Sequence, residues 1–393
     1  MNIAIIEPSA HGHSTYVETM ISVFSSYSGN NISLFAHPDI LKALDSKKLQ
    51  GVNVIEIQDA ESIWKLISGT SLKHIICVTL EPVSKNTYHW ARSIIKANTK
   101  AEIHFVVHNI NFWKPLGFFT ALKNSLSGTR SIPALLLNFR KWFLYIPQTR
   151  SIIRRVNSSK GKFILVSDAV RKEFERQLGL KNTWVIPFSV FTEGNLHATA
   201  PTDSGLRICI PGIVSSRRRD YDSVLEAMQN PCLTQFRNRI TWDLLGRINQ
   251  AEGGEEIAEK CRQLIAQGHQ ILLHGDKLIP MDTFDSLLQQ ADIILGNLKV
   301  SISRDAQYGI SKESGLVYNM IKAAKPGLIK DDYPFDQELS SSVLSFSKYE
   351  QLPEAIIQLL DHPELLNKLA SEALLNARKY RPEIIYAGLF LRE

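Results

Sequence analysis

Short apolar runs alternate with amphipathic segments along most of the chain. In the first half, the apolar runs predict strands over Ile3–Glu7, Ile32–Ala36, Val52–Ile57, His74–Thr79, Ile103–Val107, Phe163–Val166 and Thr183–Ile186. The segments between most of them predict helices over Ser14–Ser26, Ala60–Ile67, Tyr88–Lys96 and Ala169–Leu178. Apolar strands that alternate with helices are typical of a parallel, doubly wound α/β sheet that is covered on both faces.

Residues 192–205, with the sequence TEGNLHATAPTDSG, interrupt this pattern. Their small and polar side chains, with Gly and Pro among them, are typical of a linker. The alternation then restarts and predicts a second domain of the same kind. Its predicted strands are Leu206–Ile210, Ile240–Leu245, Gln270–Leu273, Asp292–Leu295 and Gly327–Lys330, and its predicted helices are Tyr221–Gln229, Glu255–Gln267, Thr283–Gln290 and Glu313–Ala324, with closing helices near 350–378.

The length of 393 residues agrees with this division, since it suits two domains of about 150–200 residues each. We predict a first Rossmann-like domain over residues 1–195, with an insertion near 110–160, and a linker over 196–205. A second Rossmann-like domain follows over 206–378, and a tail over 379–393 is free to pack back on the first domain. Two such domains facing each other would form a ligand cleft at the carboxyl ends of their sheets.

The composition excludes several other classes of protein. Hydrophobic residues make up 44% and charged residues 21%, the balance of a folded globular protein. No apolar run approaches the roughly 18 residues that span a bilayer, and the start MNIAIIEPSA lacks the basic region of a signal peptide. The cysteines form no CxxC pair, which favours reduced thiols in a cytoplasm over a disulfide framework or a zinc knuckle: Cys77, Cys209, Cys232 and Cys261.

The net charge of +6 is unevenly distributed. No Asp or Glu lies between Glu102 and Asp168, where bulky aromatic residues are interspersed with Lys114, Lys123, Arg130, Arg140, Lys141, Arg150, Arg154, Arg155, Lys160 and Lys162. Aromatic groups mixed with fixed positive charge favour docking on an anionic membrane surface through residues 112–155. A plain helical insertion on the sheet is the alternative. Single-stranded nucleic acid is the weakest interpretation, and we expect no nucleic-acid partner.

The end of the first strand of the second domain carries the sequence IPGIVSSRRRDY, from Ile210 to Tyr221. Gly212 allows a tight backbone turn, and three arginines precede a helix that is predicted to begin near Asp220. Because arginine at a helix N-terminus opposes the helix dipole, we predict that Arg218 or Arg219 contacts a phosphate. The alternative is that the three arginines form a solvated helix start.

A second candidate site is the sequence YGISKESG, which ends at Gly315 just before a predicted helix. Backbone N–H groups near Ser314 and Gly315 could hold a phosphate, with Lys312 adding charge and Glu313 accepting ribose hydroxyls. Ser311 belongs to the same polar loop. The alternative is a capped helix in which Gly315 packs tightly on the sheet.

The second half resembles the nucleotide-binding domain of GT-B glycosyltransferases of the family-4 kind, also called glycosyl transferases group 1. The resemblance runs over about 115 residues from Gly212 to Pro326 and follows the order of the motifs that contain Gly212 with Arg219, Val224–Ala227, Trp242–Gly246, Ile271–Gly275, Ala291–Ile294 and Lys325-Pro326. It implies two Rossmann-like domains that face each other across a cleft, with no metal or other cofactor. The family usually has two glutamates eight positions apart where this chain has Ser311 and Asn319, which implies a divergent branch.

In the first domain, the loop after the first strand reads PSAHGHS, from Pro8 to Ser14. Gly12 lets the backbone turn, and Ser14 is a candidate N-cap. Inverting GT-B enzymes often carry a catalytic histidine here, so the resemblance implies His13, or else His11, as the base that deprotonates an acceptor hydroxyl. Either histidine could instead only pack or cap the helix.

Polar residues also end two later strands of the first domain. The resemblance places an acceptor- or donor-contacting histidine at His108, which Asn109 follows, and Thr79 and Glu81 end the preceding strand. Each could line the cleft or only hydrogen-bond within its loop. Glu7 is a further candidate, for which a structural role is the main interpretation.

The sequence therefore predicts a glycosyltransferase that moves a sugar from a nucleotide-sugar to a glycan or lipid-linked acceptor in surface polysaccharide synthesis. We expect it to be cytoplasmic and peripheral at the inner face of the cell membrane. A nucleotide-sugar epimerase of the same fold and a catalytically degenerate scaffold subunit are the alternatives. The sequence does not identify the sugar, the nucleotide or the acceptor.

Overall fold

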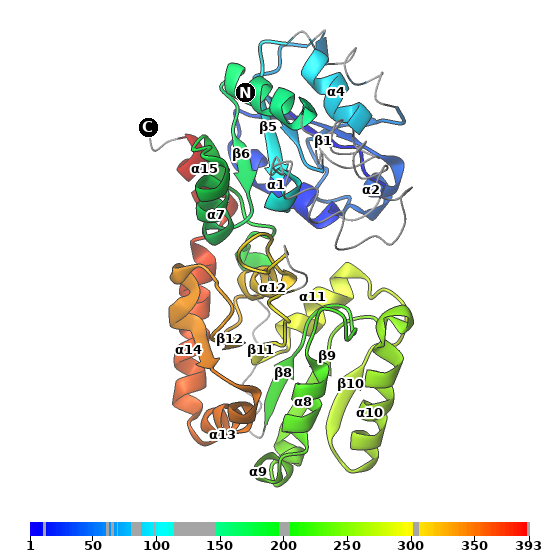
Figure 1. Cartoon of the computed structure of the whole chain (residues 1–393), viewed down its shortest axis with the longest axis vertical. Coiled ribbons are helices and arrows are strands. Elements are labelled where there is room, and N and C mark those ends of the chain that lie inside the picture. The colour runs from blue at the N-terminus through cyan, green and yellow to red at the C-terminus, as the bar shows by residue number, and fades with distance from the viewer. Residues whose placement is uncertain are drawn as a thin grey trace, which may run out of the picture. The chain divides into compact units, whose positions relative to one another are not determined.

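Figure 1 shows the computed structural model of the chain, which describes residues 1–10, 13–59, 63, 67, 68, 70–79, 88–97, 99–113, 147–195, 205–301 and 306–390. Its contacts divide the chain into two compact units. Unit 1 contains Met1–Phe188 with Tyr386–Glu393, and unit 2 contains Ser189–Ile385.

Unit 1 is built on a seven-stranded sheet with the strand order β3-β2-β1-β4-β5-β6-β7, in which all neighbouring strands are parallel. The strands are β1 (Asn2–Glu7), β2 (Asn31–Ala36), β3 (Asn53–Glu56), β4 (His74–Cys77), β5 (Glu102–Val107), β6 (Phe163–Leu165) and β7 (Thr183–Val185). Because β1 lies between β2 and β4, the order of the strands reverses there. Such a switch point is where open α/β sheets bind ligands, at the carboxyl ends of the strands.

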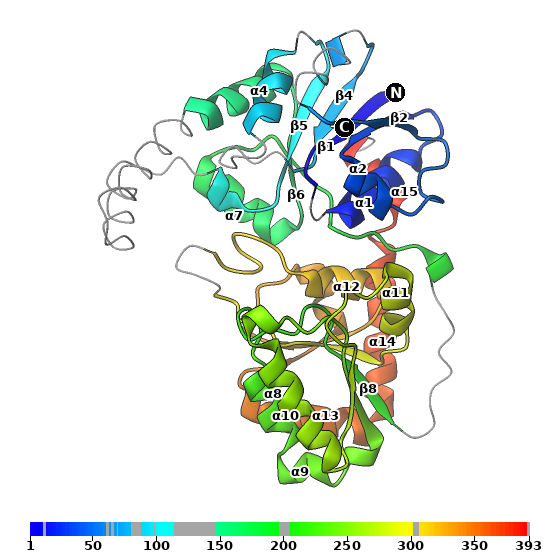
Figure 2. The ribbon, with the colours of Figure 1, turned by 90° about the vertical axis from the view of Figure 1, so that its right-hand side faces the viewer.

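Helices of unit 1 pack on this sheet, and Figure 2 shows their ribbons from a second direction. Apolar side chains of the helices and strands form a shared core. They are α1 (Ser14–Ser25), α2 (Pro38–Ala43), α4 (Tyr88–Lys96), α7 (Asp168–Leu178) and the last turns of α15 (Pro382–Phe390), together with the 3-10 helix η1 (Ile110–Phe112) and a helical segment over residues 147–158. One continuous core includes Trp90 and Ile94 of α4, Ile152 and Val156 of the 147–158 segment, and Phe105 of β5.

Unit 2 repeats the architecture with a six-stranded parallel sheet of order β10-β9-β8-β11-β12-β13. The strands are β8 (Leu206–Cys209), β9 (Ile240–Leu244), β10 (Gln270–Leu273), β11 (Ile293–Gly296), β12 (Gly327–Lys330) and β13 (Val343–Phe346). Here β8 lies between β9 and β11, so the first strand of the unit again marks the switch point.

The helices of unit 2 contribute to two core clusters together with the strands. They are α8 (Tyr221–Met228), α9 (Pro231–Thr234), α10 (Gly254–Ala266), α11 (Met281–Gln289), α12 (Gly315–Ala323), α13 (Leu352–Asp361), α14 (Pro363–Arg378) and the start of α15, with 3-10 turns η2 (Glu193–Asn195), η3 (Arg237–Arg239), η4 (Gln250–Glu252), η5 (Gln337–Ser342) and η6 (Tyr349–Gln351). Buried Trp242 of β9 and Tyr221 of α8 belong to the same cluster.

The two parallel sheets confirm the predicted α/β class and its strand-helix alternation. The sequence pattern missed α2, α9 and β13, which are too short for their periodicity to stand out. The predicted linker 196–205 lies outside the described residues apart from Gly205, as do most of the predicted helix Ala60–Ile67 and most of the insertion near 110–160.

We expect Gly161→Ala to destabilise unit 1 by about 2 kcal/mol or more, the cost of overpacking a core. Gly161 precedes β6, and a Cβ there would overlap the carbonyl oxygen of Ile103 in β5, which the sheet holds in place. Gly388→Ala is the matched control, since a Cβ at this exposed position of α15 meets no described atom within 4 Å. It should stabilise the protein by roughly 0.5–1 kcal/mol. Urea unfolding that ranks the two variants alike would contradict this account.

Candidate functional site

In unit 2 the chain turns sharply at Gly212, directly after β8. Gly212 has a φ of 108°, in the region that L side chains rarely adopt, and a Cβ there would overlap the guanidinium of Arg219. That guanidinium donates from Nη1 to Asn297 Oδ1 at 2.9 Å and from Nη2 to the carbonyl oxygen of Pro211. Glycine is therefore required for Arg219 to lie across the turn.

The backbone segments that follow β8 and β11 also pair with each other. Arg219 and Leu298 form an antiparallel bridge, and the N–H groups of Asp220 and Lys299 donate to the carbonyl oxygens of Asn297 and Arg218. Asn297 is fully buried at the end of β11. These bonds fix the position of the arginine segment at the switch point of the sheet.

The three consecutive arginines have different environments. Arg217 forms an ion pair with Glu252 at 2.9 Å, and Arg219 is held by Pro211 and Asn297. Arg218 is exposed, and within the described part of the chain its guanidinium forms no ion pair or hydrogen bond. Asp220 caps α8 by accepting from the N–H of Ser223, which confirms the predicted helix start. Arg218 is thus the arginine most available to a bound anion.

The N-terminus of α12 lies beside this turn. Leu316, the second residue of α12, packs against the end of β11, where a Cβ at Gly296 would lie 2.6 Å from it. The N-cap residue Ser314 makes no side-chain cap hydrogen bond, and its hydroxyl instead pairs with the hydroxyl of Tyr333 at 2.9 Å. Gly315 is exposed, and no described atom lies within 4 Å of a Cβ built on it.

These observations contradict the alternative of a side-chain-capped helix in which Gly315 packs tightly on the sheet. The helix begins at Gly315 rather than at Glu313, because Ser314 has extended backbone angles. The amide groups of the first turn of α12 carry positive partial charge and are open to an anion.

The remaining residues of the predicted loop stabilise the loop itself. Ser311 Oγ accepts from the N–H of Gln307 at 2.9 Å, and the ammonium group of Lys312 lies 5.7 Å from the ring centre of Tyr308. Glu313 is buried and accepts hydrogen bonds from the Tyr333 hydroxyl and the Ser314 N–H. The pKa of Tyr333 lies well above its usual value. Burial is the main cause, and the negative charge of the Glu313 carboxylate is the second. The predicted contact of Glu313 with ribose hydroxyls stays a prediction.

In unit 1 the structure brings two predicted histidines together. His13 is the N-cap of α1 and has a φ of 108°, and its ring stacks on that of His108, with 4.2 Å between centroids. His108 Nε2 lies 2.8 Å from the carbonyl oxygen of Val78. Since a carbonyl only accepts, Nε2 of His108 carries a proton.

Aromatic residues enclose this histidine pair. Phe188 stacks on Tyr16 with 4.6 Å between centroids and contacts the rings of His13 and His108. The Tyr16 hydroxyl donates to the carbonyl oxygen of Ile186 at 2.9 Å, which fixes this segment on α1. The prediction of Ser14 as N-cap was wrong by one residue, because α1 already begins at Ser14. Asn109 instead caps η1 by accepting from the N–H of Asn111 at 3.0 Å.

Glu7, at the end of β1, is fully buried near these residues. One carboxyl oxygen accepts from the N–H of Ser9 at 2.9 Å, and the other accepts from the hydroxyl of Thr79, which follows β4. Burial raises the pKa of Glu7 to about 7, although both hydrogen bonds act in the opposite direction. His11, Gly12 and Glu81 lie outside the described residues, and their predicted roles stay predictions.

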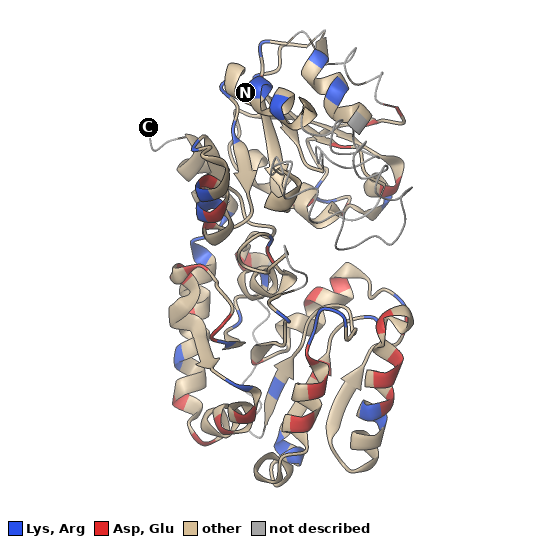
Figure 3. Ribbon diagram, viewed as in Figure 1, with Lys and Arg blue, Asp and Glu red and all other residues tan. Residues whose placement is uncertain are grey.

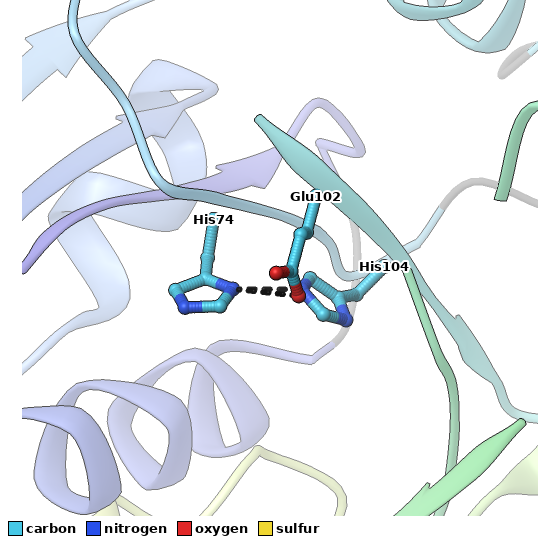
Figure 4. A group of neighbouring side chains, drawn as sticks. All are labelled: His74, Glu102 and His104. Carbon is cyan, nitrogen blue, oxygen red and sulfur yellow. Dashed lines mark hydrogen bonds and ion pairs between the residues drawn. The ribbon is translucent and has the colours of Figure 1, made fainter. Parts of the chain in front are cut away.

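A separate cluster at the amino ends of β4 and β5 has residue types that could bind a metal ion (Figure 4). His74 Nδ1 lies 3.1 Å from His104 Nε2 and 3.5 Å from a carboxylate oxygen of Glu102. However, the N–H of Lys162 donates to His104 Nδ1 at 3.1 Å, so a neutral His104 carries its proton on Nε2.

That proton points at His74 Nδ1, so the two ring nitrogens share a hydrogen bond. They therefore do not both present a lone pair to a metal ion. Burial lowers the pKa of His104 well below its usual value and that of His74 to about 4, so both rings are neutral near pH 7. The cluster thus fits a hydrogen-bond network across β4, β5 and the start of β6 better than a metal centre. The expectation that no metal or cofactor is needed stays a prediction.

Sequence reasoning missed Asn297, Tyr333 and Phe188. Asn297 gives a weak signal, because a polar residue after an apolar strand marks a strand end. Tyr333 and Phe188 lie 19 or more residues from the groups that they contact, and nothing in the local sequence pattern connects them to those groups.

We expect Arg219→Ala to lower the free energy of unfolding by about 2 kcal/mol, because it removes two charge-assisted hydrogen bonds and leaves Asn297 buried without this partner. Arg218→Ala, at an exposed site, should change it by less than about 0.5 kcal/mol. Chemical denaturation of both variants checks the difference, and equal losses would show that Arg219 does not fix the turn.

Comparison with known proteins gives structural relatives. No protein-family model and no curated protein sequence matches the chain. A glycosyltransferase from Rickettsia africae ESF-5 aligns with a TM-score of 0.64 at 13% identity, over 99% of this chain and 96% of that one. Anabaena Alr3699/HepE in complex with UDP-glucose aligns with a TM-score of 0.63 at 13% identity, over 100% of both chains.

Sucrose-phosphate synthase from Thermosynechococcus elongatus aligns with a TM-score of 0.61 at 12% identity, over 99% of this chain and 97% of that one. These similarities extend over both units and match two parallel Rossmann-like sheets. The chain therefore has the GT-B fold of these glycosyltransferases, as the sequence predicted.

Proposed function

We propose that the chain is a glycosyltransferase that uses a nucleotide-sugar donor. The observation that carries this proposal is the anion site of unit 2. At the neighbouring ends of β8 and β11, the exposed Arg218 and the open N-terminus of α12 offer fixed positive charge and free amide groups. This combination suits the diphosphate of a nucleotide.

The structural relatives support a uridine nucleotide as the first one to test, because Alr3699/HepE has been crystallised with UDP and with UDP-glucose. In our proposal the diphosphate contacts the amides of Gly315 and Leu316 and the guanidinium of Arg218. Lys312 adds charge to the loop. As the bond from sugar to phosphate breaks, these groups stabilise the negative charge that develops on the leaving diphosphate.

The acceptor hydroxyl would bind in unit 1, where His13 is the proposed base. An imidazole that is neutral near pH 7 can accept the proton of a hydroxyl as that oxygen attacks the sugar. His108 keeps one ring nitrogen bonded to Val78 and stacks on His13, so it holds the ring of the base in position. We propose a glycan or lipid-linked acceptor of surface polysaccharide synthesis, as the sequence predicts.

A thermal-shift screen against UDP, GDP, ADP, CMP and dTDP tests the donor site. A nucleotide at 100 times its dissociation constant should add about 2.7 kcal/mol of stability.

Arg218→Ala should weaken binding of that nucleotide about 10- to 100-fold, because a charge-assisted hydrogen bond is worth about 1.5–3 kcal/mol. Arg217→Ala is the control and should leave the affinity nearly unchanged, since Arg217 is paired with Glu252. A wild-type protein that binds no nucleotide and turns over no nucleotide-sugar would refute the proposal.

We also propose that unit 1 docks on an anionic membrane surface at the inner face of the cell membrane. Exposed cations gather on and shortly after α4 and the helical segment 147–158. Both helices belong to one core, and Arg155 donates hydrogen bonds to the carbonyl oxygens of Ala97 and Thr99 after α4. Figure 3 shows basic positions on both helices. The exposed cations are Arg92, Lys96, Lys100, Arg150, Arg154 and Lys160.

Within the described residues, none of these six cations forms an ion pair. Each Lys or Arg near an anionic surface adds about 1 kcal/mol, so together they support reversible docking. The aromatic stretch that suggested this surface runs over residues 112–155, and its part from 114 to 146 lies outside the described residues. None of the described helices has both the length and the apolar composition that a membrane crossing requires.

Vesicle flotation tests this surface. The wild-type protein should float with vesicles that contain phosphatidylglycerol and not with phosphatidylcholine alone, and added salt should release it. The triple variant Lys96→Gln, Arg150→Gln, Arg154→Gln should lose most of the binding, because about 3 kcal/mol corresponds to roughly 100-fold. A control with Lys260→Gln and Arg262→Gln in unit 2 removes exposed charge elsewhere. Equal flotation of both variants would exclude this face.

A further inference from the structure

The buried carboxyl group of Glu7 has no role in the proposed donor site or as the proposed base. It lies at the end of β1, at the switch point of the unit 1 sheet, and is fully buried. A buried carboxyl group is costly unless its hydrogen bonds are satisfied, so its partners identify what it does there.

Both partners belong to the segments that carry the two stacked histidines. Ser9, whose N–H donates to Glu7 at 2.9 Å, lies four positions before His13 in the sequence. Thr79, whose hydroxyl donates to the other carboxyl oxygen, follows Val78, and the carbonyl oxygen of Val78 accepts from His108 Nε2 at 2.8 Å. One carboxyl group thus joins Ser9, shortly before His13 in the sequence, to the strand end that holds His108.

The backbone at His13 needs such support. Its φ of 108° is unusual for a residue with a side chain, and strained conformations of this kind persist only where the surroundings hold them. The stacking of His13 on His108 alone is worth about 0.5–1.5 kcal/mol, less than the roughly 1–3 kcal/mol that such strain costs. The two hydrogen bonds of Glu7 lie on either side of this pair, at Ser9 and at Thr79.

We propose that Glu7 is a positioning residue of the transferase reaction, which holds the His13 segment and the Thr79 strand end together so that the two imidazoles stay stacked. This inference rests on the proposed function, because it assigns a role in the acceptor site. Glu7 is not itself the base, since its side chain is fully buried and both oxygens are engaged by protein groups. No proton moves to or from it in the reaction.

The ionisation of Glu7 gives the inference a measurable signature. The carboxyl group titrates at a pKa of about 7, raised by burial from its ordinary 4.5. A raised pKa means that the folded state binds a proton more tightly than the unfolded state between pH 4.5 and 7. The contribution of Glu7 to stability is therefore greatest below pH 4.5 and is lost as the pH rises through 7.

Other ionisable groups on the elements around Glu7 must be separated from this signature. They are the Cys77 thiol on β4, His37 after β2, His13 at the start of α1 and His108 after β5. Burial raises the pKa of Cys77 well above its usual value, so this thiol stays neutral through the pH range of interest. The three histidines are present in every variant below, so a difference between variants isolates Glu7.

Three substitutions separate hydrogen bonding from charge. Glu7→Gln removes the charge but can still accept from the Ser9 N–H and donate to the Thr79 hydroxyl. Glu7→Leu removes both bonds, and Thr79→Val removes one with little change in shape. Glu102→Gln is the matched control, because it makes the same substitution at the opposite end of the sheet of unit 1.

We expect Glu7→Leu to lower kcat about 30- to 100-fold, because displacing a catalytic group by about 1 Å can lower the rate by this order. Thr79→Val should lower kcat about 5- to 10-fold, and both variants should keep the KM for the nucleotide-sugar within twofold. Glu7→Gln should keep kcat within about threefold, and its thermal stability relative to wild type should rise between pH 5 and pH 8. Glu102→Gln should leave kcat unchanged.

A wild-type kcat in both Glu7→Leu and Thr79→Val would overturn the inference. An equal loss of kcat in Glu7→Gln and Glu7→Leu would also overturn it, because that result would assign the role to the charge of Glu7 rather than to its hydrogen bonds. If Glu7→Leu does not fold, Thr79→Val decides. If the wild-type protein transfers no sugar, the proposed function fails, and NMR still tests the positioning. The Hε2 signal of His108 should then shift in Thr79→Val and not in Glu102→Gln, and an unchanged signal would overturn the inference.

Discussion

The requirement that parallel strands be buried on both faces determines where this protein can place polar chemistry. Where a helix follows a strand and returns over the sheet, as after β1, β8 and β11, the strand-to-helix turn lies at the edge formed by the carboxyl ends of the strands. In both units the strand that comes first in the sequence lies in the interior of the sheet. The next two strands along the chain lie on one side of it, and the later strands, beginning with β4 or β11, lie on the other side. At the ends of β1 and β4, and at those of β8 and β11, one side chain bonds to chain segments that follow both strands.

The two units meet this need with different chemistry at equivalent places. In unit 1 the carboxyl group of Glu7 joins the end of β1 to Thr79 after β4. In unit 2 the guanidinium of Arg219 joins the turn after β8 to Asn297 after β11. In our proposal, the carboxyl group positions a pair of histidines that moves a proton, and the guanidinium holds the turn beside which a diphosphate binds. A sugar transfer needs both tasks.

The sequence predicted the alternation of strands and helices because strand burial and helix amphipathicity are local, periodic signals. It also placed Gly212 and the arginines after β8, since a glycine turn and a helix cap are local too. It did not predict which arginine stays exposed, because that depends on Glu252 and Asn297, which are distant in sequence. It left Gly315 undecided between a tight contact and an open position, and only the packing of Leu316 on Gly296 separates the two. The contact between His13 and His108 was likewise inaccessible, since it depends on the order of strands in the sheet.

The central claim is that unit 2 binds a nucleotide diphosphate at the neighbouring ends of β8 and β11. A crystal structure of the chain soaked with UDP tests this most directly, since it locates the phosphate oxygens. The account predicts these oxygens within hydrogen-bond distance of the amides of Gly315 and Leu316 and of the Arg218 guanidinium, with Arg219 still bonded to Pro211 and Asn297. Density for the diphosphate away from the N-terminus of α12, or in unit 1, would contradict it.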